Sequence, residues 1–350
     1  MEEKYFDTIN EAPRANSSTV LSSLSKDARG IRLGSPSARR VFSSFGGAKS
    51  ATVERGWDVR RPAEAEDRHS STAQRPWSSA KEDKPTWCPG CGNFGIIRAL
   101  KNALSKLRLT PKDAVLVYGI GCHGNMHNFL KTTAFSSLHG RVLPVAQGIK
   151  MVNPKLTVLG IAGDGDALGE GGNHLIHAAR RNINLTYLIH DNRVYALTTG
   201  QTSPTSPLNF KTKSTPAGNF EVPVNPLSLS LTAGATFVAR GFAGDIPHLT
   251  EIIVRAINHQ GFSVVNILQP CVSFNPQNTY DWYKEHILSL EKTGYKPDNK
   301  IEAVKKSLDE EKLWVGIFYE ETRKTGEEYL PPIRKITDLR DISSILEEFK

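Results

Sequence analysis

Residues 163–192 read GDGDALGEGGNHLIHAARRNINLTYLIHDN. This stretch begins where an apolar run, residues 156–162, ends, and it closes just after a second apolar run, residues 185–190. Short apolar runs of this length predict buried strands, and residues 172–180 between them predict a helix. A strand, a helix and a second strand in this order predict a parallel sheet, and ligands bind such sheets at the carboxyl ends of their strands.

Two polar side chains at that edge predict a cation site. Asp164 follows the first strand and Asn192 follows the second. The backbone carbonyl of Val194 can add a third oxygen, because the chain must turn there. Mg²⁺ prefers oxygen ligands and commonly shares its coordination with phosphate groups. The alternative is an ordinary strand–turn–helix unit in which the glycines are incidental.

Glycines around these side chains favour the binding of an anion. Gly169, Gly171 and Gly172 allow the backbone to come close to it, and the helix that starts near Gly172 turns its free N–H groups toward it. A diphosphate beside Mg²⁺ suits both features. The candidate cofactor-binding residues in this stretch are Gly163, Asp164, Gly165, Asp166, Gly171, Gly172 and Asn192.

The chain has four cysteines, Cys88, Cys91, Cys122 and Cys271. The last two each follow an apolar strand, residues 114–118 and residues 262–268, so they are expected at the edge that carries the cation site. Four thiolates are the set that a [4Fe–4S] cluster needs. A structural Zn²⁺ site and inert buried thiols stay open as alternatives. Disulfides are not expected in a chain with no recognisable secretory signal.

The spacing from GDG (163–165) to Asn192 resembles the diphosphate-binding signature of thiamine diphosphate enzymes. Five further segments resemble the β subunit of the 2-oxoacid:ferredoxin oxidoreductases: VYALTTGQTSPTSP (194–207), HAARRN (177–182), GIGCHGNMHNFL (119–130), LHGRVLP (138–144) and LQPCVSFN (268–275). The resemblance runs from about residue 87 to about residue 283. This chain has Asp191 and Thr199 where many members of the resembled families have Asn and Lys, respectively.

The resemblance implies a thiamine diphosphate-binding α/β fold, with helices on both faces of a parallel sheet. It implies that Asp164, Asn192 and Val194 hold Mg²⁺, and that Cys122 and His123 lie beside the cofactor. The four cysteines are then the ligands of a [4Fe–4S] cluster. The implied reaction is oxidative decarboxylation of a 2-oxoacid, such as pyruvate or 2-oxoglutarate, to acyl-coenzyme A and CO₂, with electrons passing through the cluster to ferredoxin. The alternatives are a subunit of a non-oxidative thiamine-dependent decarboxylase or synthase, and a zinc-bearing structural subunit.

The resemblance also implies a partner chain and a substrate site. In the resembled family the carboxylate that activates the cofactor belongs to a domain on an α chain, and no such domain is recognisable in this sequence. The chain is therefore expected to be inactive alone and to form an αβ or (αβ)₂ enzyme. Asn125 and Thr199 are the candidates for facing the substrate. Because both are neutral, they slightly disfavour a dicarboxylic substrate.

Length and composition exclude some classes of protein. The chain has 350 residues, 39% hydrophobic residues and a formal net charge of +8. No apolar run reaches the roughly 18 residues of a transmembrane helix, so no membrane span is predicted. Few cysteines and no recognisable export signal lead us to expect a cytoplasmic location. The positive charge accompanies no nucleic-acid-binding motif, so nucleic acid is not an expected partner. The charge suits an acidic partner such as ferredoxin, or is simply that of a solvated surface.

The chain divides into three parts. Residues 1–80 are rich in Ser, Arg and Ala without periodicity, which predicts a disordered or non-native extension. Residues 81–283 are expected to form the cofactor-binding domain with the iron–sulfur site, and residues 284–350 a C-terminal extension. Further helices are expected at 94–107, 226–233, 247–258, 301–308 and 338–349, a strand at 236–239, and a long loop at 196–224.

Overall fold

The computed structural model describes residues 85–309 and 311–330. The strands are β1 (Ala114–Tyr118), β2 (Thr133–Ser136), β3 (Thr157–Gly163), β4 (Leu185–Asp191), β5 (Val194–Tyr195), β6 (Gln201–Thr202), β7 (Phe237–Phe242), β8 (Phe262–Leu268), β9 (Ile287–Ser289) and β10 (Leu313–Glu320). The helices are α1 (Asn93–Lys106), α2 (Val142–Val152), α3 (Gly172–Arg181), α4 (Pro226–Ala233), α5 (Ile246–Asn258), α6 (Tyr280–His286) and α7 (Lys300–Ser307). Short helical turns are η1 (Gly124–Asn128), η2 (Gly165–Glu170), η3 (Glu291–Thr293) and η4 (Gly326–Tyr329).

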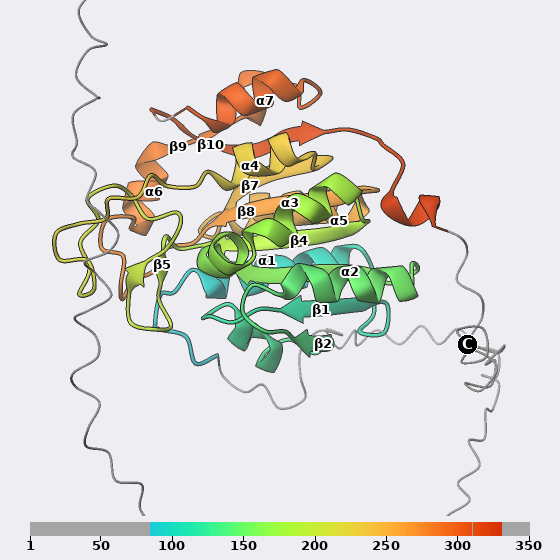
Figure 1. Ribbon diagram of the computed structural model, residues 1–350, viewed down its shortest axis with the longest axis horizontal. Coiled ribbons are helices and arrows are strands. Elements are labelled where there is room, and N and C mark those ends of the chain that lie inside the picture. Colours follow the sequence, from blue (N-terminus) through green and yellow to red (C-terminus); the bar gives the residue numbers. More distant parts are fainter. Residues whose placement is uncertain (1–84, 310, 331–350) are drawn as a thin grey trace, which may run out of the picture. The chain divides into compact units, whose positions relative to one another are not determined.

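Eight of the strands form one sheet, in the order β2-β1-β3-β4-β8-β7-β10-β9 (Figure 1). Neighbouring strands are parallel, except that β10 runs antiparallel to β7. The two short strands β5 and β6 pair with each other in a separate antiparallel hairpin. The sheet thus confirms the parallel α/β architecture expected from the sequence.

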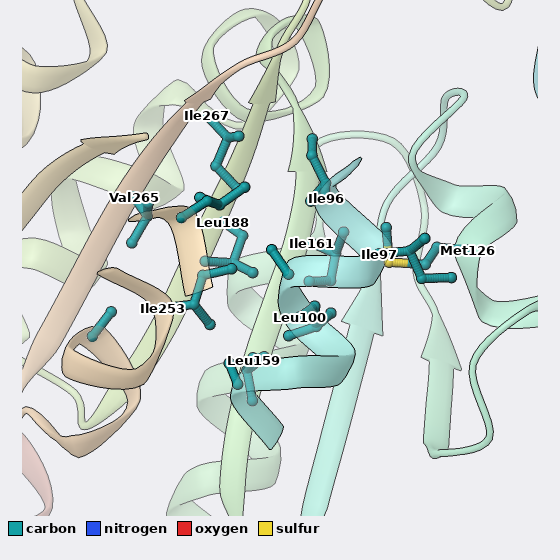
Figure 2. Close-up of a cluster of buried hydrophobic side chains, with 14 of the residues drawn as sticks. Ile96, Ile97, Leu100, Met126, Leu159, Ile161, Leu188, Ile253, Val265 and Ile267 are labelled. Atoms are coloured by element: carbon teal, nitrogen blue, oxygen red, sulfur yellow. The ribbon is translucent and has the colours of Figure 1, made fainter. Parts of the chain in front are cut away.

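Two hydrophobic layers cover the faces of the sheet. Leu159 and Ile161 of β3 pack with the apolar sides of α1 and α5, a layer shown in Figure 2. Their neighbours Val158 and Ala162 point the other way and pack with α2, α3 and α4. Because both faces of the sheet are covered, the central strands are buried along almost their whole length and are mainly apolar. This is the physical reason why they can be recognised as apolar runs in the sequence.

Four adjacent parallel strands, β1, β3, β4 and β8, bring distant residues to the same edge of the sheet. Asp164 directly follows β3 and Asn192 directly follows β4. Cys122 follows β1 by four residues and Cys271 follows β8 by three. The order of the strands therefore places the cysteines on either side of the aspartate and the asparagine.

The structure contains helices and strands that the sequence did not predict: α2, α6, β2, β5, β6, β9 and β10. All four residues of β2 are exposed at the edge of the sheet, so no burial pattern marks it. β10 joins the main sheet, and its pairing with β7 shifts register between Ile317 and Tyr319, next to Gly316, whose φ of 125° favours glycine. The predicted extension 1–80 and helix 338–349 lie outside the described residues.

The predicted helices and strands within the described residues are present, and apart from the end of the strand at 236–239 each end is unchanged or shifts by one residue. The strand expected at 236–239 is longer and runs from Phe237 to Phe242. The long loop contains one short strand, β6. In the part of the chain that the structure covers, none of the helices has both the length and the apolar character that a membrane span requires.

Candidate functional site

Two cavities lie side by side at the carboxyl edge of the sheet. The first, which we call the aspartate cavity, has a volume of about 190 Å³, and its lining includes His123, His139, Gly163, Asp164, Gly165, Asp166, Val194 and Tyr195. The second, the cysteine cavity, has a volume of about 200 Å³, and its lining includes Trp87, Cys88, Cys91, Asn125, Thr199, Gln269 and Cys271. Cys122, Asn192, Ala196 and Leu197 line both cavities and form a shared wall.

Asp164 is the buried charged group of the aspartate cavity, with an exposed fraction of 2%. The hydroxyls of Ser203 and Thr205 donate hydrogen bonds of 2.5 and 2.7 Å to its Oδ2. Burial, followed by the negative charge of Asp191, raises the pKa of Asp164 to about 7, although the two hydroxyls oppose this shift. A bound cation would offset the cost of keeping this carboxylate charged in the interior.

Thr205 stands between two carboxylates. Its Oγ1 lies 2.7 Å from Oδ2 of Asp164 and 2.9 Å from Oδ1 of Asp191. A hydroxyl carries one proton, so it can donate to only one of them. At the other carboxylate the hydroxyl oxygen and the carboxylate oxygen repel each other, unless a proton or a cation lies between them. Asn266 donates to the opposite oxygen of Asp191, at 3.1 Å, and supports that carboxylate.

Asn192 and Val194 are held by a tight turn at Arg193, whose φ is 60°. The backbone N–H of Val194 donates to Oδ1 of Asn192 at 3.1 Å. The hydroxyl of Ser206 donates to the carbonyl oxygen of Arg193 at 2.6 Å. The amide of Asn192 and the carboxylate of Asp164 line the same cavity, as does Val194. This is the set of residues that the sequence predicted for Mg²⁺.

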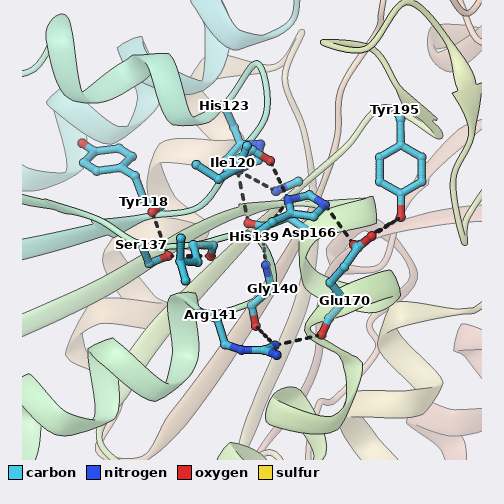
Figure 3. Close-up of polar contacts among 12 residues, drawn as sticks. Tyr118, Ile120, His123, Ser137, His139, Gly140, Arg141, Asp166, Glu170 and Tyr195 are labelled. Atoms are coloured by element: carbon cyan, nitrogen blue, oxygen red, sulfur yellow. Dashed lines mark hydrogen bonds and ion pairs between the residues drawn. The ribbon is translucent and has the colours of Figure 1, made fainter. Parts of the chain in front are cut away.

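Asp166 also lines the aspartate cavity, and it lies between His123 and His139 (Figure 3). Its Oδ1 accepts a hydrogen bond of 2.6 Å from the backbone N–H of Gly140, and Nδ1 of His139 lies 3.3 Å away. Nε2 of His123 lies 3.3 Å from Oδ2 of Asp166 and 3.1 Å from the backbone nitrogen of Gly163. If Nε2 accepts from Gly163 it carries no proton for Asp166, so the tautomer of His123 decides which contact is a hydrogen bond.

The glycines of the signature have different surroundings. Gly165 begins η2, a π-helical turn, and a Cβ at this position would come within 2.1 Å of Cε1 of Tyr195. Gly163 and Gly165 line the aspartate cavity. Gly171 and Gly172 lie at the junction of η2 and α3, outside the lining of that cavity. The helical turn beside the cavity is therefore η2, whereas the sequence pointed to the start of α3.

The four cysteines surround the cysteine cavity, and all are free thiols. Burial raises the pKa of the Cys91 thiol, and burial together with the neighbouring cysteines raises that of Cys122 to about 11. Positive charge from metal ions is what converts such buried thiols to thiolates. Among the described residues, no three side chains of His, Cys, Asp or Glu are grouped closely enough to hold a single metal ion.

Loops that carry the cysteines are tied to each other by hydrogen bonds. The indole Nε1 of Trp87 donates to the carbonyl oxygen of Cys122 at 2.7 Å. The backbone N–H of Gly92 donates to the carbonyl oxygen of Pro270 at 3.1 Å. The substrate candidates Asn125 and Thr199 line this cavity, and Thr199 has a φ of 75°. The structure thus brings the predicted substrate-facing residues to the side of the cysteines.

Sequence reasoning did not single out several residues that line the two cavities or donate hydrogen bonds to Asp164. These are Trp87, His139, Tyr195, Ser203, Thr205 and Gln269. Most of them fall within segments that carry the resemblance, such as LHGRVLP and LQPCVSFN, so the segments marked the region without indicating which side chain faces the site. The serines and threonines of the 203–206 loop carry no periodic signal that would connect them to Asp164.

Comparisons with known proteins identify the family of the segments that carry this site. Residues 119–267 match the family model for the C-terminal TPP-binding domain of thiamine pyrophosphate enzymes, where thiamine pyrophosphate is another name for thiamine diphosphate. Residues 271–335 match the model for the C-terminal part of the pyruvate ferredoxin oxidoreductase β subunit. These two matches together cover the sheet edge and the strands β9 and β10.

Individual relatives extend the similarity. The chain is 44% identical over 247 residues to a 2-oxoacid:ferredoxin oxidoreductase subunit β of Saccharolobus solfataricus, which covers 67% of this chain and 81% of the relative. It is 48% identical over 189 residues to the 2-oxoglutarate oxidoreductase subunit KorB of Mycobacterium tuberculosis, covering 54% of this chain and 51% of that subunit.

A solved structure is similar over most of the chain. It is the 2-oxoglutarate:ferredoxin oxidoreductase of Magnetococcus marinus, with 2-oxoglutarate, coenzyme A and succinyl-CoA bound. The TM-score is 0.72 and the identity 35%, over 81% of this chain and 98% of the other. On these similarities the chain belongs to the family of 2-oxoacid:ferredoxin oxidoreductase β subunits.

Proposed function

We propose that this chain, together with an α subunit, converts a 2-oxoacid and coenzyme A to acyl-coenzyme A and CO₂. The two electrons released would pass one at a time to two molecules of oxidised ferredoxin, and one proton would be released. Family membership supports the reaction class. The single observation that carries the proposal for this chain is the wall of Cys122, Asn192, Ala196 and Leu197 that the aspartate and cysteine cavities share.

The aspartate cavity is proposed to hold Mg²⁺ and the diphosphate of thiamine diphosphate. Asp164, Asn192 and Val194 would supply oxygen ligands, in agreement with the preference of Mg²⁺ for carboxylate and carbonyl groups. The raised pKa of Asp164 supports this, because a buried carboxylate beside Asp191 gains most from a nearby cation. When bound, thiamine diphosphate supplies the carbon nucleophile that attacks the keto group of the substrate.

The cysteine cavity is proposed to hold a [4Fe–4S] cluster. Its donor set of four cysteines is the set that such a cluster takes. Each thiolate would bind a different iron, so the four sulfurs need only surround the cavity and need not converge on one point. When bound, the cluster accepts and passes on single electrons.

The chain's own residues would keep the two groups close together and shielded from water. Leu197 and Ala196 separate the cavities with apolar side chains, and Asn192 spans the same wall. Ser203 and Thr205 orient the Asp164 carboxylate through their hydrogen bonds. Trp87 fixes the Cys122 loop through its bond to the Cys122 carbonyl oxygen. A fixed geometry of this kind lowers the cost of bringing the reacting groups together.

The partners are proposed from the relatives and from the site. The name of the relatives as β subunits supports an α subunit, which would supply the activating carboxylate in an αβ or (αβ)₂ enzyme. Ferredoxin is the acceptor named in the relatives, and the exposed Cys88 places one cysteine of the cavity at the surface. The relatives include 2-oxoglutarate enzymes, whose substrate is a dicarboxylate. Activity with pyruvate and with 2-oxoglutarate should be compared, because the proposed substrate-facing residues Asn125 and Thr199 are both neutral.

The experiment is anaerobic purification of the chain with its α subunit, followed by quantitation of iron, sulfide, zinc, Mg²⁺ and thiamine diphosphate. We expect about four iron and four sulfide per β chain, the number in one [4Fe–4S] cluster. The visible absorption of the cluster should bleach when a 2-oxoacid and coenzyme A are added. Thiamine without iron would favour a non-oxidative decarboxylase or synthase, and zinc without iron or sulfide would favour a structural subunit.

A further inference from the structure

Gln269 is a buried amide held between the sheet edge and the Cys91 loop. It directly follows β8, and 2% of its surface is exposed. Its backbone N–H donates to the carbonyl oxygen of Asp191 at 2.9 Å, which ties it to the end of β4. A Cβ at position 92 would come within 2.6 Å of Cγ of Gln269, so the absence of a side chain at Gly92 is what lets the glutamine pack against this loop.

The side chain of Gln269 reaches a cysteine sulfur. Its Nε2 lies 3.6 Å from Sγ of Cys91, and both residues are buried. Oε1 of the same amide has no hydrogen-bond partner among the described residues. A thiolate can accept hydrogen bonds but cannot donate one, so the nitrogen end of the amide is the end that should face a thiolate. The amide is therefore oriented by the sulfur and by no other polar group of the described chain.

We propose that Gln269 is a positioning residue that sets the reduction potential of the iron–sulfur cluster by donating its Nε2–H to Sγ of Cys91; this rests on the function proposed above. One-electron reduction places additional negative charge on the cluster and on its sulfur ligands. An N–H dipole directed at a sulfur stabilises that charge, and hydrogen bonds to the sulfurs are among the factors that set cluster potentials. The low polarity of the buried site strengthens the effect.

Two substitutions separate this electrostatic role from packing. Gln269→Leu keeps an aliphatic side chain of similar size but removes the donor, so the midpoint potential of the cluster should fall. Gln269→Glu keeps the shape and replaces the dipole by a negative charge, so the potential should fall further. A matched control is Thr186→Val, which removes one buried hydrogen bond, from Oγ1 to the Ala256 carbonyl oxygen, at the other end of β4. The midpoint potential of the cluster in the Thr186→Val enzyme should equal that in the wild type.

The measurement is a redox titration of the αβ holoenzyme followed by electron paramagnetic resonance, after iron and sulfide have been quantified in each sample. A wild-type potential in iron-replete Gln269→Leu and Gln269→Glu enzymes would overturn the proposal and leave the proposed function intact. A wild-type enzyme without iron would overturn both.

A second measurement covers variants that fail to assemble the cluster. In unmodified holoenzyme labelled with ¹⁵N in the glutamine side-chain amide, electron–nuclear double resonance of the reduced cluster should detect a coupled ¹⁵N nucleus and an exchangeable proton on it. The absence of any such coupling in iron-replete wild-type enzyme would overturn the proposal without any substitution.

Discussion

The ring of Tyr195 lies against Gly165, so closely that a Cβ at position 165 would come within 2.1 Å of its Cε1. The hydroxyl of the same tyrosine lies 3.3 Å from a carboxylate oxygen of Glu170, at the end of η2. The β5 strand, which begins with the proposed Mg²⁺ ligand Val194, is thereby packed on the turn that carries the GDG signature. This contact therefore connects the GDG turn, residues 163–165, to the segment that follows Asn192.

Gly165→Ala should therefore damage the aspartate cavity. The new methyl group has no room unless Tyr195 moves, and overpacking of this kind costs about 1–3 kcal/mol. We expect weaker thiamine diphosphate binding and a lower melting temperature of the αβ complex. Gly148→Ala in α2 is the control, because a Cβ there meets nothing within 4 Å and helix propensity favours alanine. Equal cofactor content in both variants would contradict the packing argument.

Asp164→Ala should abolish retention of thiamine diphosphate and spare the iron. The substitution removes the charged ligand proposed for Mg²⁺, while the four cysteines lie in the neighbouring cavity. We expect the cofactor affinity to fall by more than the roughly 10–100-fold that the loss of an outer-shell partner costs. Affinity is measured by titration with the cofactor and Mg²⁺, and iron by chemical assay. Asp281→Ala, at an exposed site on α6, is the control.

Cys271→Ala should have the opposite effect. Iron and sulfide should be lost, because one of the four proposed cluster ligands is absent, whereas Mg²⁺-dependent binding of thiamine diphosphate should persist. Val272→Ala, at the neighbouring exposed position, should retain both. Full iron content in the Cys271 variant would show that this cysteine is not a ligand, and loss of both groups would show that the cavities do not behave independently.

Thr205→Val tests whether the hydroxyl between Asp164 and Asp191 supports the cation site. The variant keeps the shape of the side chain but removes the only proton that the threonine can donate to either carboxylate. Loss of a hydrogen-bond partner of a metal ligand typically lowers affinity by roughly 10–100-fold. We expect that loss for Mg²⁺ and thiamine diphosphate, with unchanged iron. Thr232→Val on α4, whose hydroxyl bonds only within its helix, should bind the cofactor as the wild type does.

The fold and the position of the site could be predicted because the central strands are buried on both faces. Each such strand is a buried and mainly apolar run, and the polar residue after it marks the edge of the sheet, as for Asp164 after β3 and Asn192 after β4. The same reasoning placed Cys122 and Cys271 at that edge. Two strands were missed for different reasons: β2 is fully exposed and lacks this pattern, whereas β10 is a buried apolar run that lies beyond the segment carrying the family resemblance.

Residues that act through loops could not be predicted in the same way. Ser203 and Thr205 bond to Asp164 across 39 and 41 positions of the chain, and no periodicity encodes the path of the loop between them. The packing of Tyr195 on Gly165 could not be predicted either, because it depends on the turn at Arg193 that redirects the chain. The glycines illustrate the limit: the signature identified the region, but only Gly163 and Gly165 of the candidate glycines line the cavity.

The ion pair between His248 and Glu291 predicts a pH-dependent stability. Nε2 of His248 on α5 lies 3.4 Å from Oε1 of Glu291 at the start of η3. Burial alone would raise the pKa of Glu291, but hydrogen bonds from His248 and Ser289 outweigh it and lower this pKa to about 2. The hydrogen bond with Glu291 raises the pKa of His248 above its usual value, in spite of burial.

The directions of the two pKa shifts determine how the stability contributed by this ion pair changes with pH. Because folding lowers the pKa of Glu291, its contribution is present above the unfolded value of about 4.3 and is lost as the pH falls toward about 2. Because folding raises the pKa of His248, its contribution is complete below about pH 6.5 and is lost as the pH rises through the raised value. The pair should therefore stabilise the fold most between about pH 4.5 and pH 6.5, by less than about 1 kcal/mol, since both side chains are partly exposed.

Glu291→Gln should lower the melting temperature of the αβ complex more at about pH 5.5 than at about pH 8.5, whereas Glu285→Gln at an exposed position of α6 should lower it at neither. The same decrease at both pH values would show that the ion pair is not the source of the stabilisation.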